Sequence, residues 1–212
     1  MCGISGIFDT QGTRSYAREL IARINDAQAH RGPDEHDLHL EPGLALGHRR
    51  LSVIDLAAGQ QPLFNAAGTV GIVFNGEIYN YRELTAELKA LGYHFRTRSD
   101  TEVIVHAWSA WGEACVHRLR GMFAFALWDR DRQTLFLARD RMGVKPMHYA
   151  WLPDGSFVFG SELKVLTAHP GFARDIDPLA VEEYFTFGYV QDPRCIYRHA
   201  HKLPAAHTLT LK

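Results

Sequence analysis

Residues 122–138, MFAFALWDRDRQTLFLA, decide the fold class of this chain. The first seven residues are apolar on both faces of an extended strand, which is typical of a strand covered by a layer on each side. The polar residues 129–133 indicate a turn, and residues 134–138 predict a second strand paired with the first. The segment therefore predicts a hairpin in the interior of a layered protein.

Further strands and helices surround this hairpin in the sequence. A second hairpin is predicted across the turn Pro153-Asp154-Gly155, and single strands are predicted at residues 3–8, 44–46, 51–54, 70–74 and 207–212. Helical periodicity and capping residues predict helices at residues 17–29, 84–91, 99–111, 162–167 and 178–187. Strand pairs alternate with helix pairs, so we expect an α+β fold with two mostly antiparallel sheets packed together and helices outside.

The composition excludes several classes of protein. The 212 residues are 46% hydrophobic and carry a net charge of −1, so disorder and nucleic-acid binding are disfavoured. No apolar stretch reaches the roughly 18 residues that a membrane span needs, and the N-terminus does not resemble a signal peptide. The three cysteines include no CxxC pair, and the 12 histidines form no HExxH motif. We therefore expect no metal site and a reducing, cytoplasmic setting.

Cys2 is the residue with the clearest chemical potential. Removal of Met1 would give Cys2 both a thiol and a free α-amine, which together make a nucleophile with its own general base. An α-amine with a pKa near ~7.7–8 is already roughly 10–20% neutral at pH 7. The alternative is that Cys2 is simply a buried small hydrophobic residue.

Seven short motifs, taken together in order and spacing, resemble one known family. They are CGISG (2–6), HRGPD (30–34), HRRLS (48–52), NGEIYN (75–80), SDTE (99–102), GMFAF (121–125) and RDRMG (139–143). The chain resembles the glutaminase domain of class II glutamine amidotransferases, of the asparagine synthetase (glutamine-hydrolysing) type. The residues within these motifs also resemble those of the asparagine-synthetase-like amidotransferases associated with bacterial exosortase systems.

The resemblance covers residues 1–212 and implies a fold and a reaction. The implied fold is the four-layer αββα sandwich of N-terminal-nucleophile hydrolases. The implied reaction is hydrolysis of L-glutamine to L-glutamate and ammonia through a thioester on Cys2. Ammonia would then pass to a C-terminal ATP-dependent domain, which by family default makes asparagine from aspartate. The Ser-Gly-Gly-x-Asp-Ser type loop of that domain is absent from this sequence, so ATP and magnesium are expected only there and no cofactor is expected here.

The resemblance also implies roles for individual residues. The Asn75 side chain and the Gly76 N–H would form the oxyanion hole, although Asn-Gly alone is the commonest signal for a simple turn. Arg50 would bind the α-carboxylate of glutamine, Asp100 its α-ammonium, and Glu77 would support Asp100 or face the amine directly. The rest of the glutamine pocket would be lined by Leu51, Ser52, Val53 and Ile54. Residues 30–34, 139–146 and 161–162 are interpreted as structural, or for the last two as lining the contact with the synthetase domain.

Three alternatives stay open at this point. One is a non-catalytic regulatory or interface domain with the same fold. Another is an N-terminal-nucleophile amidase that acts on a different amide, although such an enzyme has little use for Arg50 paired with Asp100. The weakest is a metal hydrolase. Among partners we expect L-glutamine and the synthetase domain, with no nucleic acid and no membrane insertion, and a homodimer stays open.

Overall fold

The computed structural model describes residues 1–52 and 59–212, and their strands form two antiparallel sheets. The first sheet contains β1 (Gly3–Phe8), β2 (Glu35–Glu41), β3 (Leu44–Arg50), β8 (His148–Trp151), β9 (Phe157–Gly160) and β10 (His201–Lys202). The second contains β4 (Leu63–Phe64), β5 (Val70–Ile78), β6 (Gly121–Asp129), β7 (Thr134–Arg139) and β11 (Thr208–Leu211). Their spatial orders are β10-β8-β9-β1-β3-β2 and β11-β7-β6-β5-β4.

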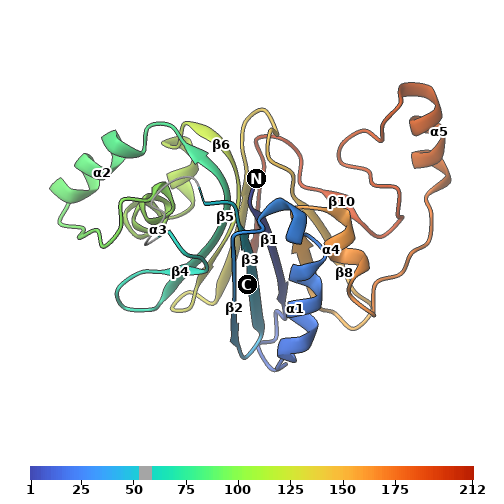
Figure 1. Cartoon of the computed structure of the whole chain (residues 1–212), viewed down its shortest axis with the longest axis horizontal. Helices are drawn as coiled ribbons and strands as arrows, with labels where there is room; N and C mark the ends of the chain where they lie inside the picture. Colours follow the sequence, from blue (N-terminus) through green and yellow to red (C-terminus); the bar gives the residue numbers. More distant parts are fainter. Residues whose placement is uncertain (53–58) are drawn as a thin grey trace.

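Helices cover the outer face of each sheet (Figure 1). The first sheet is covered by α1 (Arg18–Asp26) and α4 (Leu163–Thr167), and the second by α2 (Tyr81–Ala90) and α3 (Asp100–Trp111). Two short 3-10 turns, η1 (Ala29–Arg31) and η2 (Gly112–His117), follow α1 and α3. A further helix, α5 (Pro178–Phe187), lies at the side of the molecule. The predicted four-layer αββα arrangement is confirmed.

The central hairpin behaves as its sequence predicts. In β6, Phe123, Phe125 and Leu127 pack against α3 in the outer core, which also contains Trp108. The alternate residues of β6, including Trp128, pack in the core between the two sheets. Because side chains alternate across a strand, apolar residues at consecutive positions serve both cores. The same strand therefore joins one helical layer to the opposite sheet.

Side chains cap the N-termini of both α3 and α5, as the sequence predicts. Asp177 accepts a hydrogen bond from the Leu179 N–H at 3.0 Å, as expected before Pro178. Ser99 caps α3 by accepting from the Glu102 N–H at 3.4 Å. The Glu102 side chain does not complete a capping box with Ser99, because its carboxylate instead accepts the N–H groups of residues 96 and 97 in the preceding loop.

Four predictions of element bounds need correction. The helix expected at 17–29 ends at Asp26 and is followed by η1. The strands expected at 44–46 and 51–54 are replaced by the single strand β3, which ends at Arg50; of the second segment, residues 53–54 lie outside the described residues. β2 was not predicted, because this edge strand is rich in charged residues and histidine. β5 continues through Asn75 and Gly76 to Ile78 instead of turning there.

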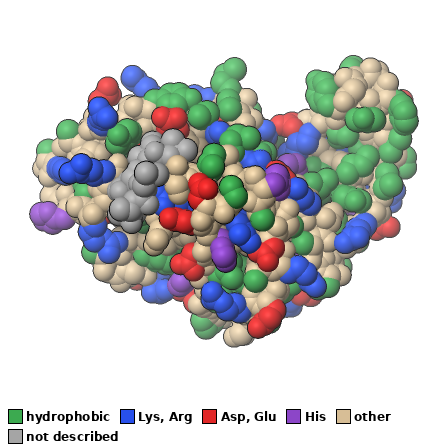
Figure 2. All heavy atoms as spheres, viewed as in Figure 1, with side chains coloured by type: hydrophobic (Ala, Val, Ile, Leu, Met, Phe, Trp, Pro, Cys, Tyr) green, Lys and Arg blue, Asp and Glu red, His purple; other side chains and the backbone are tan. Residues whose placement is uncertain are grey.

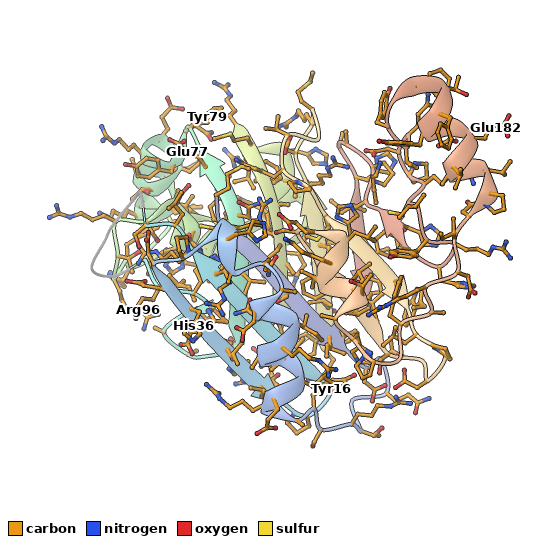
Figure 3. All side chains as sticks on the ribbon, turned by 45° about the vertical axis from the view of Figure 1, so that its right-hand side comes forward. Tyr16, His36, Glu77, Tyr79, Arg96 and Glu182 are labelled. Atoms are coloured by element: carbon orange, nitrogen blue, oxygen red, sulfur yellow. The ribbon has the colours of Figure 1, made fainter. Side chains whose placement is uncertain are left out.

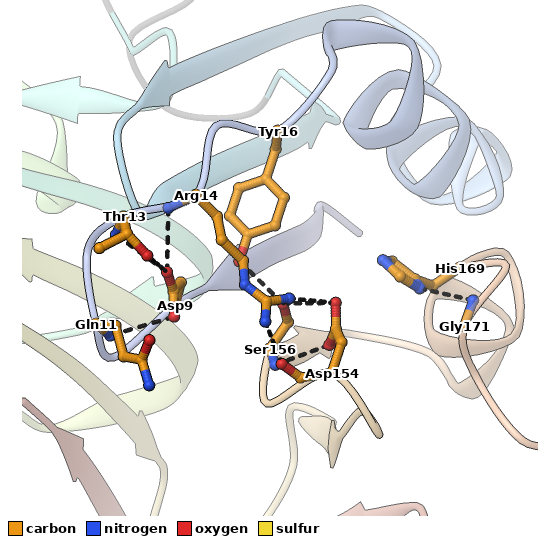
Figure 4. Close-up of polar contacts among 9 residues, drawn as sticks. All are labelled: Asp9, Gln11, Thr13, Arg14, Tyr16, Asp154, Ser156, His169 and Gly171. Atoms are coloured by element: carbon orange, nitrogen blue, oxygen red, sulfur yellow. Dashed lines mark hydrogen bonds and ion pairs between the residues drawn. The ribbon is translucent and has the colours of Figure 1, made fainter.

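The far end of β1 is tied to the turn before β9 (Figure 4). The Asp9 carboxylate accepts three backbone N–H groups of the following loop, including that of Arg14 at 3.1 Å. The Arg14 guanidinium pairs with Asp154 and donates to Ser156 at 3.2 Å. Tyr16 also lies within hydrogen-bond distance of Ser156, at 3.2 Å. These contacts anchor β1 at the end opposite Cys2.

The helix α5 buries little of its surface. Its one buried residue is Ala180, whereas Phe185 is 83% exposed. Figure 2 shows hydrophobic side chains gathered at the upper right, where Figure 1 places α5. Figure 3 shows Glu182 of this helix far from Glu77 and Tyr79, which lie at one end of β5. Among the helices of residues 1–52 and 59–212, none combines the length and apolarity needed to cross a membrane.

Candidate active site

Most of the predicted site residues line one cleft, although they come from four different elements. The cleft has a volume of about 770 Å³ including its open mouth. Cys2 directly precedes β1, Arg50 ends β3, Asn75 and Gly76 lie in β5, and Asp100 begins α3. The predicted residues that line the cleft are Cys2, Arg50, Leu51, Asn75, Gly76, Glu77 and Asp100. Ser52 is not in this lining, and Val53 and Ile54 lie outside the described residues.

Cys2 presents a partly buried thiol to the cleft. Its Sγ lies 3.7 Å from the carbonyl oxygen of Leu51, to which the S–H donates. Burial raises the pKa of the Cys2 thiol, while the nearby cations Arg50 and Arg31 oppose this rise. A thiol with a raised pKa is protonated at neutral pH, so nucleophilic attack requires a base that removes its proton.

Arg31 fixes the backbone of the nucleophile. Its Nε donates to the Cys2 carbonyl at 2.9 Å, and its Nη1 pairs with the Glu162 carboxylate at 3.0 Å. The arginine side chain is only 8% exposed, so this ion pair is well shielded from water. Residues 30–34 are predicted to be structural, and residues 161–162 to be structural or to line the contact with the synthetase domain. These contacts show that Arg31, itself paired with Glu162, supports the backbone of Cys2.

Asn75 points its side chain across the gap between the sheets toward Cys2. In the amide orientation that pairs both ends, its Nδ2 donates to the Cys2 carbonyl at 3.1 Å, and its Oδ1 accepts from Arg31 at 3.3 Å. The residue is 1% exposed. An amide held in this way has its N–H₂ group beside the nucleophile, where a negatively charged oxygen would form during attack.

The register of β5 determines where the Gly76 N–H points. The backbone N–H groups of odd-numbered residues point toward β6. The Tyr79 N–H shows this, because it donates to the carbonyl of Arg120, just before β6, at 2.7 Å. The backbone N–H groups of even-numbered residues point toward the opposite edge of β5. The Phe74 N–H shows this, because it donates to Gln61 at 2.6 Å. Gly76 has the same parity as Phe74, so its N–H points away from β6 at the cleft that Gly76 lines.

This N–H group is available as a donor. Within residues 1–52 and 59–212, no acceptor pairs with the Gly76 N–H. Only glycine fits here, because a Cβ would lie 2.2 Å from the carbonyl oxygen of Met122 and 2.7 Å from the Cα of Phe123. The close approach of β6 therefore explains the glycine, and the strand register explains the exposed donor.

Arg50 and Asp100 bring opposite charges to the cleft. Arg50 is 4% exposed, and its Nη1 donates to the Glu35 carboxylate at 2.7 Å on the neighbouring strand β2. Asp100 is also 4% exposed, and its Oδ2 accepts the Ile78 N–H at 2.9 Å. A ligand that carries a carboxylate and an ammonium group on one carbon would have a partner of opposite charge for each group.

The Asp100 carboxyl has an unusual ionisation. Burial raises its pKa from an ordinary 3.8 to about 6, the Ile78 N–H opposes this rise, and the negative charge of Glu77 adds to it. The group is still ionised at pH 7.5, although its charge is poorly solvated. An ammonium ligand placed between Asp100 and Glu77 would relieve both effects, because it supplies the missing positive charge.

The sequence analysis missed three residues around this cleft. Lys145 lines it with a side chain that is 6% exposed, and its Nζ lies 3.4 Å from the sulfur of Met1. Gln61 also lines it, and His48 lies behind it with its Nε2 donating to the Phe74 carbonyl at 3.1 Å. Burial lowers the pKa of His48 to about 4. The roles of Gln61 and of His48, which belongs to the motif at residues 48–52, depend on contacts with the distant residue Phe74.

The described residues contain no group of three or more His, Cys, Asp or Glu side chains arranged to hold a metal ion. Cys115 and Cys195 are both free and buried. Burial raises the pKa of the Cys115 thiol to about 12 and that of the Cys195 thiol to about 11, so neither resembles an activated nucleophile.

Comparison with known proteins connects this geometry to a family. A family model described as a glutamine amidotransferase domain matches residues 1–212. The chain is 40% identical over 213 aligned residues to asparagine synthetase (glutamine-hydrolyzing) 3 of Bacillus subtilis (strain 168), covering 99% of this chain and 34% of that protein. It is 41% identical over 167 residues to the asparagine synthetase of Zea mays, covering 79% of this chain and 28% of that protein.

A solved structure supports the fold. Glutamine phosphoribosylpyrophosphate amidotransferase from B. subtilis, complexed with ADP and GMP, superimposes with a TM-score of 0.68 at 20% identity, covering 84% of this chain and 46% of that chain. The chain spans about a third of the length of the curated relatives described above. Since the family model matches the whole chain, the chain belongs to the glutamine amidotransferase domain family.

Proposed function

We propose that this chain hydrolyses L-glutamine to L-glutamate and ammonia through a thioester on Cys2. The observation that carries the proposal is the arrangement around the nucleophile. The side chain of Asn75 lies beside Cys2, and the N–H of Gly76 points into the same cleft without an acceptor among the described residues. Two such donors beside a thiol match the needs of acyl transfer, in which an oxyanion forms next to the attacked carbon.

The opposite charges of Arg50 and Asp100 would account for selection of a free amino acid. The α-carboxylate of glutamine would pair with Arg50, and its α-ammonium would lie against Asp100 and Glu77. The side-chain amide would then extend toward Cys2. Larger amides without both charges would leave Arg50 and Asp100 without ligand partners inside the cleft, which makes binding of such substrates unfavourable.

The chemical steps follow from these positions. After removal of Met1, the α-amine of Cys2 takes the thiol proton, and the sulfur attacks the amide carbon of glutamine. The carbonyl oxygen becomes an oxyanion that accepts from Gly76 N–H and Asn75 Nδ2. As the oxyanion collapses, the α-ammonium gives its proton to the leaving nitrogen, so ammonia departs and a thioester remains. Water then attacks the thioester, with the α-amine as base, and releases glutamate and the Cys2 thiol.

We further propose that the ammonia passes to an ATP-dependent amide-forming domain, with aspartate as the default acceptor. The named relatives are asparagine synthetases that are about three times as long as this chain, which supports a partner domain outside these residues. ATP and Mg²⁺ would belong to that domain. A reducing cytoplasmic setting would suit the proposal, because Cys2 must remain a thiol.

The test is release of glutamate from glutamine by the purified chain, with the intact mass recorded on the same sample. We expect activity in protein that lacks Met1, no activity in Cys2→Ala, and unchanged activity in Cys195→Ala, which removes a buried thiol far from the chemistry. Activity that survives Cys2→Ala would refute the thioester mechanism. Processed protein that releases no glutamate would favour a non-catalytic role for the isolated chain.

A further inference from the structure

The edge of β5 that carries the Gly76 N–H is mostly without a neighbouring strand. Among the described residues, β4 pairs only with Gly71 and Ile72 on this edge. The N–H and the carbonyl of Phe74 therefore lie beyond the reach of β4. Buried backbone groups need hydrogen-bond partners, so other groups must replace the missing strand at this point.

Two side chains provide these partners. Gln61 Oε1 accepts the Phe74 N–H at 2.6 Å, and His48 Nε2 donates to the Phe74 carbonyl at 3.1 Å. His48 is fully buried and Gln61 is 7% exposed, so both hydrogen bonds are shielded from water. Because burial lowers the pKa of His48 to about 4, the ring is neutral at physiological pH, and its proton must be on Nε2 to face a carbonyl. We call this pair of side chains the Phe74 clamp.

The clamp also connects the parts of the cleft that contact opposite ends of the substrate. Gln61 uses its Nε2 to donate to Thr101 at 3.3 Å, and Thr101 directly follows Asp100 in α3. His48 lies in β3, two residues before Arg50 and therefore on the same face of that strand. The same two side chains thus touch β5, β3 and the start of α3.

We propose that Gln61 and His48 are positioning residues that orient the oxyanion hole by holding both backbone groups of Phe74. This inference rests on the proposed glutaminase function. Phe74 immediately precedes Asn75, and its peptide groups share one edge with the Gly76 N–H. A rotation of the Phe74 backbone would turn the Asn75 side chain and the Gly76 N–H together. Neither Gln61 nor His48 needs to touch the substrate for this effect.

A merely structural role makes different predictions. Loss of a buried hydrogen bond lowers stability wherever it lies, but a purely structural loss leaves KM and kcat of the folded molecules unchanged. Loss of oxyanion alignment lowers kcat for glutamine with little change in KM, since the oxyanion exists only during reaction. It also spares alkylation of Cys2 by iodoacetamide, in which the sulfur displaces iodide from a CH₂ group and no oxyanion forms.

The experiment compares Gln61→Met with Gln60→Met in purified chain that lacks Met1. Gln60 is the exposed neighbour of Gln61, so it is a matched control for the chemical change. We expect Gln61→Met to lose at least about tenfold in kcat, with KM within about threefold of the parent chain. The iodoacetamide rate should stay unchanged, and Gln60→Met should behave as the parent chain does.

A second pair of variants tests the other half of the clamp. His48→Phe keeps the ring shape but removes the donor, whereas His48→Gln retains an N–H that can reach the Phe74 carbonyl. We expect kcat to fall in His48→Phe and to recover at least in part in His48→Gln. If Gln61→Met fails to fold, this pair of His48 variants still tests whether the clamp orients the oxyanion hole.

Two results would overturn the inference. One is an unchanged contribution of the clamp to kcat. It would be seen as a folded Gln61→Met with the kcat of the parent chain, or as equal kcat in the two His48 variants. The other is an iodoacetamide rate that falls in parallel with kcat, which would indicate general collapse of the site. Absence of glutamate release from the parent chain itself is a different outcome, because it would refute the proposed function on which the clamp depends.

Discussion

The substitution Asp100→Asn should stabilise the protein at alkaline pH while it removes glutamine binding. The pKa of Asp100 is raised from 3.8 to about 6, chiefly by burial, with Glu77 adding to the effect. At about 1.36 kcal/mol per pKa unit, this difference corresponds to about 3 kcal/mol of unfavourable free energy when the carboxylate is charged. Asparagine has no charge, and its side-chain oxygen can still accept the Ile78 N–H.

The sign of the pH dependence follows from proton binding. Between pH 3.8 and about 6, folded Asp100 holds its proton more tightly than the unfolded chain does, so stability decreases as the pH rises through this range. The gain from Asp100→Asn should therefore be largest above pH 7, about 1–3 kcal/mol, and fall to about half that value at pH 5. Loss of the favourable charge at the start of α3, about 0.3–1 kcal/mol, reduces the gain slightly.

The assays are urea unfolding at pH 8 and pH 5, together with glutaminase kinetics at pH 8. We expect the variant to have a higher midpoint at pH 8, a smaller advantage at pH 5, and a large increase in KM for glutamine. In the parent chain, kcat/KM should fall more steeply below pH 6 than protonation of the Cys2 α-amine alone would cause, because neutral Asp100 no longer attracts the substrate ammonium. A variant that is less stable than the parent at pH 8, or that keeps its KM, would refute the reasoning.

Three further substitutions test the other contacts of the cleft. Arg50→Lys should raise KM for glutamine strongly with a smaller change in kcat, because an ammonium cannot make a bidentate pair with a carboxylate; an unchanged KM in steady-state kinetics would exclude the assigned role. Gly76→Ala should lower kcat by about 10²–10³, since a Cβ placed 2.2 Å from the Met122 carbonyl must displace β5; kcat close to that of the parent would contradict the oxyanion assignment. Arg31→Met should lower kcat and the melting temperature together, because it frees the Cys2 carbonyl and removes the most buried cationic partner of Glu162, which keeps His30 and Lys164. Thermal unfolding beside kinetics shows whether both move.

Much of the fold was predictable because it depends on local patterns. The hairpin of β6 and β7, the helix α5 with its Asp177 cap, and the two-sheet arrangement all follow from periodicity and capping. The edge strand β2 escaped prediction because residues 35–41 are dominated by charged side chains and histidine, which give no strand signal. Asn75-Gly76 gives a strong turn signal, yet tertiary pairing with β6 keeps both residues in a strand.

The main residues of the site could be predicted from the sequence, but the residues that support them could not. The motifs of the family pointed to Cys2, Arg50 and Asp100, and the structure brings them into one cleft. Gln61 and His48 were missed because their roles arise from contacts with Phe74, which is remote from both in sequence. The narrower resemblance to exosortase-associated enzymes, the homodimer and the ammonia acceptor remain predictions.

The sulfur proposed to attack the substrate and the groups proposed to bind the oxyanion belong to opposite sheets. Cys2 leads into β1, whereas Asn75 and Gly76 belong to β5, and the apolar layer between the sheets sets their separation. Stacked sheets pack about 10 Å apart, and a change of one methyl group in that layer is enough to alter their spacing. The geometry of the proposed reaction therefore depends on the packing between the sheets, so substitutions at positions such as Val73 and Ala124 should affect activity as well as folding.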